Sequence, residues 1–305
     1  MARCFVGVDG GSSETTGIVL DEAKGLVARA VGGPTNYHAA DLERAEAHLF
    51  ELIGRLLEKA GTTAGHVTHF CFALSGVSRE ADRRAIGGVL DRHGILERSA
   101  LVSDVEAVMA TVDDDGPVIV VIAGTGSVVL GRDEQGRLCK VGGNGHLLDD
   151  GGSGYDIGVS GLRAVLEASD GRGPTTQLAE TLLAAAGLGA VNEIVPWFYG
   201  SSDRKRYVAG LAPRVIETAT NGDGPATAIL QRAAEELAQW VRVAAAALSA
   251  TDRGVRIVLA GGVLEHSDLY HRLVKERIED ELPHTRVVRP DHEAAYGAAL
   301  LAMAR

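Results

Sequence analysis

The sequence predicts an α/β protein built from two related halves, because one strand-and-turn pattern occurs twice. The first copy, FVGVDGGSSETT at Phe5–Thr16, is a short apolar strand that leads into two glycines and several hydroxyl residues. The second copy, VIVVIAGTGS at Val118–Ser127, has the same order. Each copy continues as a hairpin that ends in a glycine pair, Gly32-Gly33 or Gly142-Gly143. The copies are too far apart for a solenoid repeat, so we predict two domains with one such hairpin each.

Composition supports two domains and limits the partners. A chain of 305 residues is long enough to bury two cores. Its net charge of −11 argues against nucleic acid as a partner, since nucleic acid is normally bound by a basic surface. The same charge does not exclude ATP, because backbone amides and Mg²⁺ can neutralise phosphate locally.

The cysteines and the apolar runs indicate a cytoplasmic protein. Cys4, Cys71 and Cys139 are widely spaced and form no metal-binding pattern, which favours small buried side chains in a reducing compartment. No apolar run approaches the length of about 18 residues that a membrane span needs. Asp9 also interrupts any signal peptide at the start of the chain. We therefore expect no membrane association.

The first turn can bind phosphate. Gly10 and Gly11 let the backbone turn tightly, so that successive N–H groups form a concavity that binds anions. Ser12 and Ser13 add hydroxyl donors. Asp9, at the end of the strand, is placed to hold hydrated Mg²⁺. An ordinary Asp-Gly hairpin turn explains the same residues, and only the second copy favours the phosphate interpretation.

The rest of the first half alternates between helices and strands. Helical periodicity predicts helices at 41–60, with Asp41 as N-cap, and at 79–92. A buried strand is predicted at 67–74. A short strand at 101–103 leads into Asp104, which can cap the next helix or face the crevice where α/β proteins bind ligands. These two roles are compatible.

A charged, proline-containing linker at 113–117 predicts the domain boundary. Beyond the second hairpin, residues 142–154 form the glycine-rich loop, which we expect to contact a ligand because it opens directly into a helix at 155–169. Within it, a structural role for His146 is favoured over catalysis.

The last third predicts two more helices, at 175–187 and 226–250, and a solvated connection at 199–206. A strand at 256–260 runs into Gly261-Gly262, which is either a simple turn or a close approach of the backbone to a flat ligand such as adenine. A strand at 285–288 and a final helix at 293–303 complete the chain.

The nucleotide motifs of other folds are absent. The sequence contains no G-x-x-x-x-G-K-[ST] loop, and the first turn does not match G-x-G-x-x-G. A nucleotide held between two hairpins, one from each half, is the remaining hypothesis.

Five motifs carry a family resemblance. DGGSS at 9–13, SD at 103–104, GTGS at 124–127, GHLLDDGGSG at 145–154 and AGGV at 260–263 are similar to the N-acetylglucosamine kinase and BadF-type ATPase family. The similarity covers nearly the whole chain in the right order. It implies an actin-like (ribonuclease H-like) ATPase fold, with two related domains and a cleft between them. The expected domains are 1–115, on which a helix at 293–305 packs back, and 116–292.

The resemblance also implies site roles, with ATP and Mg²⁺ as cofactors. Asp104 would be the catalytic base and Asp9 would hold the metal. The turns would bind ATP through Gly10, Gly11, Ser12, Ser13, Gly124, Thr125 and Gly126, and the nucleoside would lie against Gly261 and Gly262. The sugar would contact Asn36, Ser127, Asn144, Gly145 and Asp150.

The sequence departs from the family at four places. Glu14 stands where relatives often carry a basic residue, Val128 replaces an asparagine, and Asn144 replaces an aromatic residue. Asp149-Asp150-Gly151 replaces a Gly-Asp-Glu order. Because an amide is lost at Val128 and Asp149 adds a carboxylate to the sugar contacts, we predict that a free amine is accepted at least as well as an acetamide. Alternatively, Asp149 points into solvent.

The predicted function is an ATP-dependent sugar kinase that phosphorylates a hydroxyl, at C6, of N-acetylglucosamine or glucosamine. Two alternatives stay open: a BadF-type ATPase that activates a radical dehydratase, and a non-catalytic nucleotide or sugar switch. The first would need clustered cysteines for an iron–sulfur cluster, and the second is disfavoured by Asp104. A zinc-containing repressor is disfavoured as well, because no ligand spacing is present. A homodimer is an open alternative, because the sequence does not decide the oligomeric state.

Overall fold

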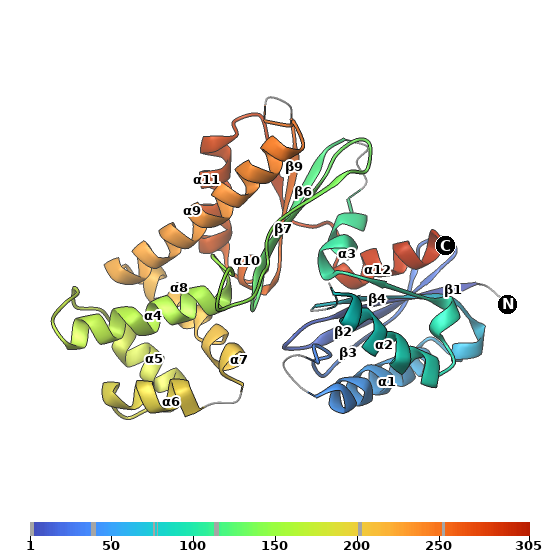
Figure 1. The fold of residues 1–305 in the computed structure, drawn as a ribbon, viewed down its shortest axis with the longest axis horizontal. Helices are drawn as coiled ribbons and strands as arrows, with labels where there is room; N and C mark the ends of the chain where they lie inside the picture. The colour runs from blue at the N-terminus through green and yellow to red at the C-terminus, as the bar shows by residue number, and fades with distance from the viewer. Residues whose placement is uncertain are drawn as a thin grey trace. The chain divides into compact units, whose positions relative to one another are not determined.

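The computed structural model describes residues 3–37, 41–75, 77, 79–112, 116–200, 203–251 and 254–305. The chain divides into two compact units, Met1–Asp113 with Pro290–Arg305 (unit 1) and Asp114–Arg289 (unit 2). Each unit contains a five-stranded sheet flanked by helices (Figure 1). The predicted α/β class with two related halves is therefore confirmed. The linker residues 113–115, where we predicted the boundary, lie outside the described residues.

The sheet of unit 1 has the order β3-β2-β1-β4-β5. Its strands are β1 (Cys4–Gly10), β2 (Thr15–Asp21), β3 (Leu26–Gly32), β4 (Val67–Leu74) and β5 (Ser99–Val102). The first three form an antiparallel meander, whereas β4 and β5 run parallel to β1. Gly10 pairs with Thr15 and with Leu74, so the turn after β1 and the end of β4 lie at one edge of the sheet.

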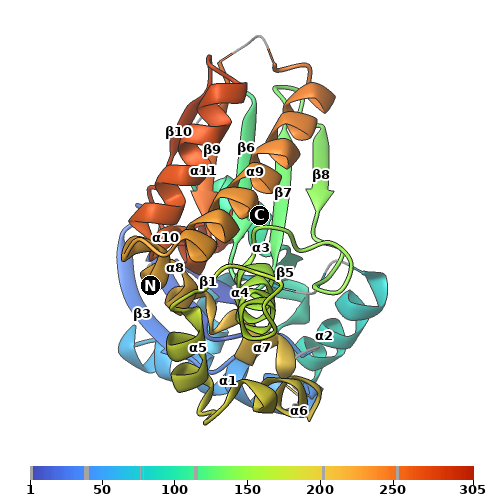
Figure 2. The same cartoon turned by 90° about the vertical axis from the view of Figure 1, so that its left-hand side faces the viewer.

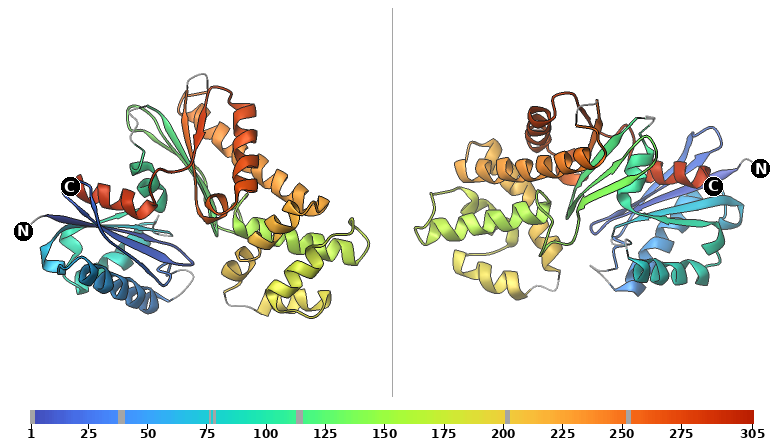
Figure 3. Two further views of the ribbon diagram at one scale, coloured as in Figure 1. Left: turned by 180° about the vertical axis from the view of Figure 1, so that it is seen from behind. Right: turned by 45° about the horizontal axis from the view of Figure 1, so that its top comes forward.

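Helices cover both faces of this sheet. They are α1 (Leu42–Lys59), α2 (Glu80–Arg92), α3 (Asp104–Ala110) and α12 (Ala294–Met303), with short 3₁₀ turns η1 (Ala64–His66) and η2 (Leu96–Arg98). Val6 and Val8 pack in one core with α1 and α2, and Phe5 packs on the opposite face with α3 and α12. Figure 3 shows α12, in red, lying along the blue strands of unit 1. The last helix thus belongs to the core of the first unit.

Gly7 explains how α12 packs so closely on β1. A Cβ at this position would lie 2.2 Å from the carbonyl oxygen of Ala295 and 2.3 Å from the amide nitrogen of Ala299. Both atoms belong to the helix backbone, which cannot move away as a flexible side chain can. Only glycine fits at this contact.

Unit 2 repeats the sheet topology, with the order β10-β9-β6-β7-β8. Its strands are β6 (Val118–Ala123), β7 (Ser127–Arg132), β8 (Leu138–Gly142), β9 (Arg256–Ala260) and β10 (Arg286–Val288). The strands β6 to β8 are antiparallel, and β9 and β10 run parallel to β6. The predicted duplication is thus present at the level of strand order and direction.

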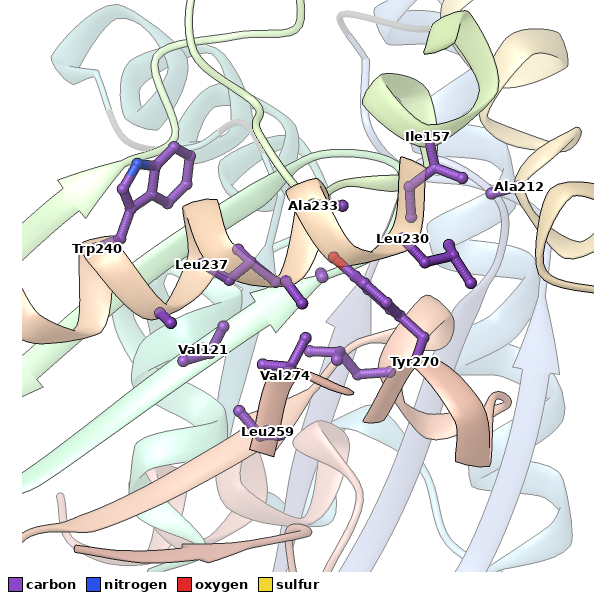
Figure 4. Packing of buried hydrophobic residues seen from close by; sticks show 14 of the residues in the cluster. Val121, Ile157, Ala212, Leu230, Ala233, Leu237, Trp240, Leu259, Tyr270 and Val274 are labelled. Carbon is purple, nitrogen blue, oxygen red and sulfur yellow. The ribbon is translucent and has the colours of Figure 1, made fainter. Parts of the chain in front are cut away.

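The helices of unit 2 form one large core on one face of this sheet. They are α4 (Gly154–Ser169), α5 (Leu178–Ala186), α6 (Ile194–Gly200), α7 (Arg204–Ala209), α8 (Ala212–Thr220), α9 (Gly224–Ala247), α10 (Gly262–Glu265) and α11 (Asp268–Glu281), with the 3₁₀ turn η3 (Val191–Glu193). The orange α9 and red α11 run side by side (Figure 2). Tyr270 belongs to α11, and its side chain is fully buried against α9, beside Leu230 and Leu237 (Figure 4). Its phenol donates to the carbonyl oxygen of Gly152 at 2.8 Å, which ties the glycine-rich loop to the core.

Within the described chain, no single helix is long and apolar enough to cross a membrane, although the bent pair 178–186 and 191–200 meets the same length and composition test jointly.

Candidate active site

The turn after β1 is a closed loop that is tied to the segment after β3. The amide of Gly11 donates to the carbonyl oxygen of Glu14 at 3.0 Å. The carbonyl oxygen of Gly11 in turn accepts from the amides of Thr35 and Asn36, at 3.2 and 3.3 Å. The predicted phosphate turn and the predicted sugar contact Asn36 are therefore neighbours in unit 1.

Side chains complete this turn. The amide group of Asn36 donates to the hydroxyl of Ser12 at 2.9 Å. A Cβ at Gly10 would lie 2.1 Å from the Thr35 hydroxyl oxygen, so the close packing at that point requires glycine. Within the described residues, the backbone N–H groups of Ser12 and Ser13 donate no hydrogen bond. These two amides are thus available to bind an anion.

Tyr37 anchors the segment that carries Asn36. Its phenol donates a hydrogen bond to the buried carboxylate of Asp82 on α2. Burial, and next the hydrogen bond to Asp82, raise the pKa of Tyr37 to about 12, so the phenol keeps its proton at neutral pH. The position of Asn36 is therefore fixed by a neighbour on a regular helix.

Asp104 is the first residue of α3, and Ser103 is its N-cap. The Ser103 hydroxyl accepts from the Glu106 amide at 3.3 Å, and the Glu106 carboxylate accepts from the Ser103 amide at 2.8 Å. The proposed capping role of Asp104 is thus taken by Ser103, which leaves the Asp104 carboxylate for other contacts.

Ser75 connects Asp104 to the end of β1. The Ser75 hydroxyl donates to Oδ2 of Asp104 at 2.6 Å, and the Ser75 amide donates to the carbonyl oxygen of Gly10 at 2.8 Å. Oδ1 of Asp104 accepts from the Val105 amide at 3.0 Å. Asp9 precedes Gly10 in β1 and is partly exposed. Asp9, the phosphate turn and Asp104 thus share one edge of the unit 1 sheet. Ser75 was not among the predicted site residues.

The corresponding turn of unit 2 lies against the start of α4. The Gly124 amide donates to the carbonyl oxygen of Gly126 at 2.9 Å, which closes the turn. The carbonyl oxygens of Gly124 and Thr125 accept from the amides of Gly154 and Tyr155, at 2.8 and 3.3 Å. Among the described residues, nothing accepts a hydrogen bond from the amides of Thr125 and Gly126. This turn offers two donors to an anion, as the first turn does.

The glycine pair after β9 lies beside this turn. Gly261 has a φ of +94°, and a Cβ there would lie 2.6 Å from the carbonyl oxygen of Ala123. A Cβ on Gly124 would lie 4.0 Å from the amide nitrogen of Gly262. Two of the predicted ATP-binding segments of unit 2 are therefore adjacent, and glycine is required for the contact at 261.

The tip of the glycine-rich loop is a compact turn. The carbonyl oxygen of Gly145 accepts from the amides of Leu148 and Asp149, at 2.9 and 2.8 Å. The side-chain amide of Asn144 donates to the carboxylate of Asp149. Asp149 is therefore engaged within the loop.

Asp150 is the buried acid of the loop. Its side chain is 5% exposed, and burial raises its pKa, an effect that Lys205 partly offsets. Oδ1 accepts from the Ser127 amide at 3.4 Å, while the Ser127 hydroxyl donates to the carbonyl oxygen of Gly151 at 2.7 Å. Oδ2 accepts no hydrogen bond, but Nζ of Lys205 lies 3.5 Å from it. The structure thus brings two predicted sugar contacts, Ser127 and Asp150, together.

Lys205 corrects the expectation that 199–206 is a solvated connection. Residues 201–202 lie outside the described residues. Arg204 and Lys205 are the first two residues of α7. Lys205 contacts Asp150 of the glycine-rich loop, and Arg204 lies over the ring of Phe198. No sequence motif indicates this contact, because a lysine in a polar, charged segment does not by itself identify its partner.

His146 has a structural environment. Its ring meets the ring of Tyr155 edge-on, with centroids 4.7 Å apart. Burial, and next the charge of Lys205, lower the pKa of His146, so it is neutral at pH 7. These contacts agree with the structural role that the sequence favoured.

Comparisons with known proteins agree with this geometry. A sequence model of the BadF/BadG/BcrA/BcrD ATPase family matches residues 6–302. An N-acetylmuramic acid/N-acetylglucosamine kinase of Clostridium acetobutylicum is 29% identical over 98% of both chains. An N-acetyl-D-glucosamine kinase of Dictyostelium discoideum is 29% identical over 98% of this chain and 97% of its own.

Solved structures resemble the fold. A Chromobacterium violaceum protein, for which N-acetylglucosamine kinase activity has been suggested, superposes with a TM-score of 0.79 at 24% identity over 99% of both chains. A ROK family glucokinase of Streptomyces griseus, in complex with glucose and AMPPNP, has a TM-score of 0.64 at 16% identity, covering 99% of this chain and 100% of its own. Component A of the Acidaminococcus fermentans (R)-2-hydroxyglutaryl-CoA dehydratase has a TM-score of 0.53 at 15% identity, covering 99% and 98%. The predicted actin-like ATPase fold is confirmed.

Proposed function

The chain belongs to the BadF/BadG/BcrA/BcrD ATPase family, and we propose that it is an ATP-dependent kinase that transfers the γ-phosphoryl group to a hydroxyl of an amino sugar, at C6. The observation that carries the proposal is the placement of Asp104, whose carboxylate is held by Ser75 beside the end of β1. A carboxylate at this edge can accept a proton from a sugar hydroxyl. The activities of the relatives support an amino sugar as the acceptor.

The two turns suit ATP as the phosphoryl donor. Each presents two backbone N–H groups that make no hydrogen bond within the described residues, namely those of Ser12 and Ser13 and those of Thr125 and Gly126. Paired amides in a glycine turn bind phosphate oxygens without adding a positive side chain. This arrangement also explains how Glu14 is tolerated in the first turn, because the backbone rather than a basic side chain provides the donors.

Asp9 fits a role in holding Mg²⁺. It is a partly exposed carboxylate that directly precedes the first phosphate turn. Magnesium in kinases is usually held by one or two carboxylates together with substrate phosphates, so one acid at this place is sufficient. When bound, the ion would neutralise charge on the phosphates.

Asp104 has the contacts of a positioned base. Ser75 and the Val105 amide each donate to one carboxylate oxygen, which fixes the orientation of the group. Each oxygen retains a lone pair that can accept from a sugar hydroxyl. As the sugar oxygen bonds to the γ-phosphorus, its proton passes to Asp104, the bond between the γ-phosphorus and the bridging oxygen breaks, and ADP leaves with that oxygen. Phosphoryl transfer depends mostly on such positioning and on charge neutralisation.

The proposed sugar contacts are Asn36 in unit 1 and, in unit 2, Ser127, Asn144, Gly145, Asp149 and Asp150. Of these, Asp150 has the environment of a ligand-binding group, because its Oδ2 is buried without a hydrogen-bond donor. A sugar hydroxyl would supply that donor, and buried acceptors are costly when they stay unpaired.

A sugar panel tests the proposal. The full-length protein is assayed for ADP release with ATP, Mg²⁺ and glucosamine, N-acetylglucosamine, N-acetylmuramic acid or glucose, and the product is analysed for its site of phosphorylation. Sugar-dependent ADP release with an amino sugar supports the proposal. ADP release that no sugar stimulates would contradict it.

The alternative role as a dehydratase activator is suggested by the family match and by the fold resemblance to component A. Its iron–sulfur cluster would need accessible thiolates. Cys71 is fully buried in the core below α12, and burial raises its pKa to about 12. Among the described residues, no group of His, Cys, Asp and Glu could hold a metal ion by itself. The kinase is therefore the better-supported function.

A further inference from the structure

The residue that follows Asp150 in the glycine-rich loop is a glycine, and a side chain from α9 fills the space beside it. A Cβ at Gly151 would lie 2.0 Å from both Cδ and Oε1 of Glu236, and 2.5 Å from Oε2. We propose that Glu236 is a positioning residue for the sugar contacts: its carboxylate group packs against Gly151, in the place of a side chain there, and fixes the loop. The inference rests on the proposed kinase function and names a residue that supports its sugar site.

The backbone conformation does not require glycine at position 151. Gly151 has no positive φ, whereas Gly152, the next residue, has a φ of +73°. The three heavy atoms nearest to a Cβ at 151 all belong to the carboxylate group of Glu236. Position 151 is also one of the places where the sequence departs from the family, with glycine instead of glutamate. A side chain at 151 and the carboxylate group of Glu236 therefore compete for one space.

Gly151 is linked to two of the proposed sugar contacts. Its carbonyl oxygen accepts from the hydroxyl of Ser127 at 2.7 Å, and it directly follows Asp150 in the chain. The Ser127 amide in turn donates to Oδ1 of Asp150 at 3.4 Å. A shift of Gly151 therefore moves both contacts together. Misplacement of a binding group by about 1 Å can lower activity by about 10²-fold, so small movements at this glycine matter.

The next residue, Gly152, is already held by the core of unit 2. Its amide donates to Oδ2 of Asp156 at 3.1 Å, and its carbonyl oxygen accepts from the phenol of Tyr270 at 2.8 Å. A Cβ at Gly152 would also lie 2.5 Å from Cγ of Leu237 on α9, which Figure 4 shows in the same cluster as Tyr270. Glu236 precedes Leu237 on α9, so it extends this support by one residue, from Gly152 to Gly151.

The surroundings of Glu236 indicate packing rather than ion pairing. Among the residues that the structure describes, none forms a salt bridge with its carboxylate. Arg232, one helical turn earlier, instead donates to the hydroxyl of Ser160 at 2.5 Å and lies 3.9 Å from Oδ1 of Asp156. Burial, and next the charge of Asp156, raise the pKa of Glu236. Because the negative charge has no cationic partner here, we expect the shape of the side chain, which glutamine shares, to be what supports Gly151.

The proposed phosphate turn of unit 2 has separate support. The Gly124 amide closes this turn on the carbonyl oxygen of Gly126, and the carbonyl oxygens of Gly124 and Thr125 accept from the amides of Gly154 and Tyr155. None of these bonds involves Gly151 or Glu236. Loss of Glu236 should therefore change the KM for the sugar and leave the KM for ATP nearly unchanged.

The experiment is a double-mutant cycle on the full-length protein, with the sugar that the wild type phosphorylates best. Glu236→Ala empties the space, and Gly151→Ala places a Cβ where the flexible carboxylate group must move away. Each single variant should raise the KM for the sugar about tenfold, with the KM for ATP within about twofold of wild type. The double variant should recover most of this loss, because the new methyl group enters the emptied space. Glu236→Gln and the control Glu235→Ala, which removes the α9 partner of Arg277, should stay within about twofold of wild type.

Three kinetic results would overturn the role of Glu236. These are an unchanged KM for the sugar in Glu236→Ala, an equal rise in the KM for ATP, and a double variant no better than the worse single variant. If the wild type phosphorylates no sugar, the kinase proposal fails, and hydrogen exchange then tests this inference by itself. The amides of Leu148, Asp149 and Gly152 all donate within the loop or to α4. Their exchange should be faster in both single variants and slower again in the double variant, and unchanged exchange would refute the contact.

Discussion

Replacing Asp104 by asparagine separates its chemical role from its structural one. Asparagine has the same shape, so its oxygen can still accept from the Val105 amide, and the Ser75 hydroxyl can rotate to accept from the new NH₂ group. The variant loses one charge-assisted hydrogen bond, about 1 kcal/mol, and the interaction of a negative charge with the N-terminus of α3, about 0.3–1 kcal/mol. The structural loss is therefore about 1–2 kcal/mol.

This loss is too small to unfold the protein. A domain with a stability at the lower end of about 5–15 kcal/mol would retain about 3 kcal/mol and stay more than about 99% folded. Loss of a general base lowers kcat by about 10²–10⁴, which corresponds to about 3–5 kcal/mol in the activation barrier. A hundredfold decrease in kcat with unchanged binding of an ATP analogue would therefore be chemical in origin.

Glu106→Gln is the matched control. Glu106 lies in the same first turn of α3 and accepts from the Ser103 amide and hydroxyl, both at 2.8 Å, so its loss removes a similar charge and hydrogen bond. We expect a similar decrease in thermal stability and a kcat within about threefold of wild type. If Asp104→Asn also keeps kcat within about threefold, or if both variants lose activity equally, Asp104 is not the base.

Four further predictions follow from the space around three glycines and from one pKa shift. Gly126→Ala would place a Cβ 2.8 Å from Oδ2 of Asp150 beside the second turn, and we expect KM for ATP to rise about tenfold in steady-state assays. Gly7→Ala would place a Cβ against the α12 backbone and should lower the free energy of unfolding in urea by about 3 kcal/mol. Gly54→Ala, in α1 with no atom within 4 Å, should raise it by up to about 1 kcal/mol. Because the pKa of His146 is lowered in the folded state, the unfolded chain binds its proton first, and the free energy of unfolding should fall as pH drops through about 6.5. His146→Gln should make that fall shallower, and an unchanged pH profile would contradict the shift.

The sequence predicts the repeated elements of the fold well, because local signals and burial agree in them. In the first hairpin, the apolar strand β1 ends at Gly10, whose position allows no larger side chain. The helix α1 has both a side-chain N-cap, Asp41, and a regular stripe of buried residues, so its start and its buried face were predicted correctly.

The helices α6, α7, α8 and α11 were not predicted, because they are short or largely charged. In α11, Tyr270, Val274 and Ile278 are the buried residues among many charged ones. They form a narrow apolar face that can be identified only once the helix is seen packed on α9. Site residues that act through tertiary contacts were missed for a similar reason. Ser75 ends a strand, and Lys205 begins a six-residue helix. Neither position has a motif, and their roles depend on carboxylates far away in the sequence.

The duplication also explains why each unit supplies different chemistry. Topologically, β5 corresponds to β10, and the residue after β4 corresponds to the one after β9. In unit 1 these positions lead to Asp104 and Ser75, so the edge holds a base and the hydroxyl that orients it. In unit 2, β10 is followed directly by Arg289, whose guanidinium binds Asp268, and β9 by Gly261, where any side chain would collide with the backbone at the end of β6. The second copy therefore has no room for a Ser75-like side chain. Its edge presents bare backbone, which suits the proposed contact with the nucleoside, and its glycine-rich loop is free to recognise the sugar.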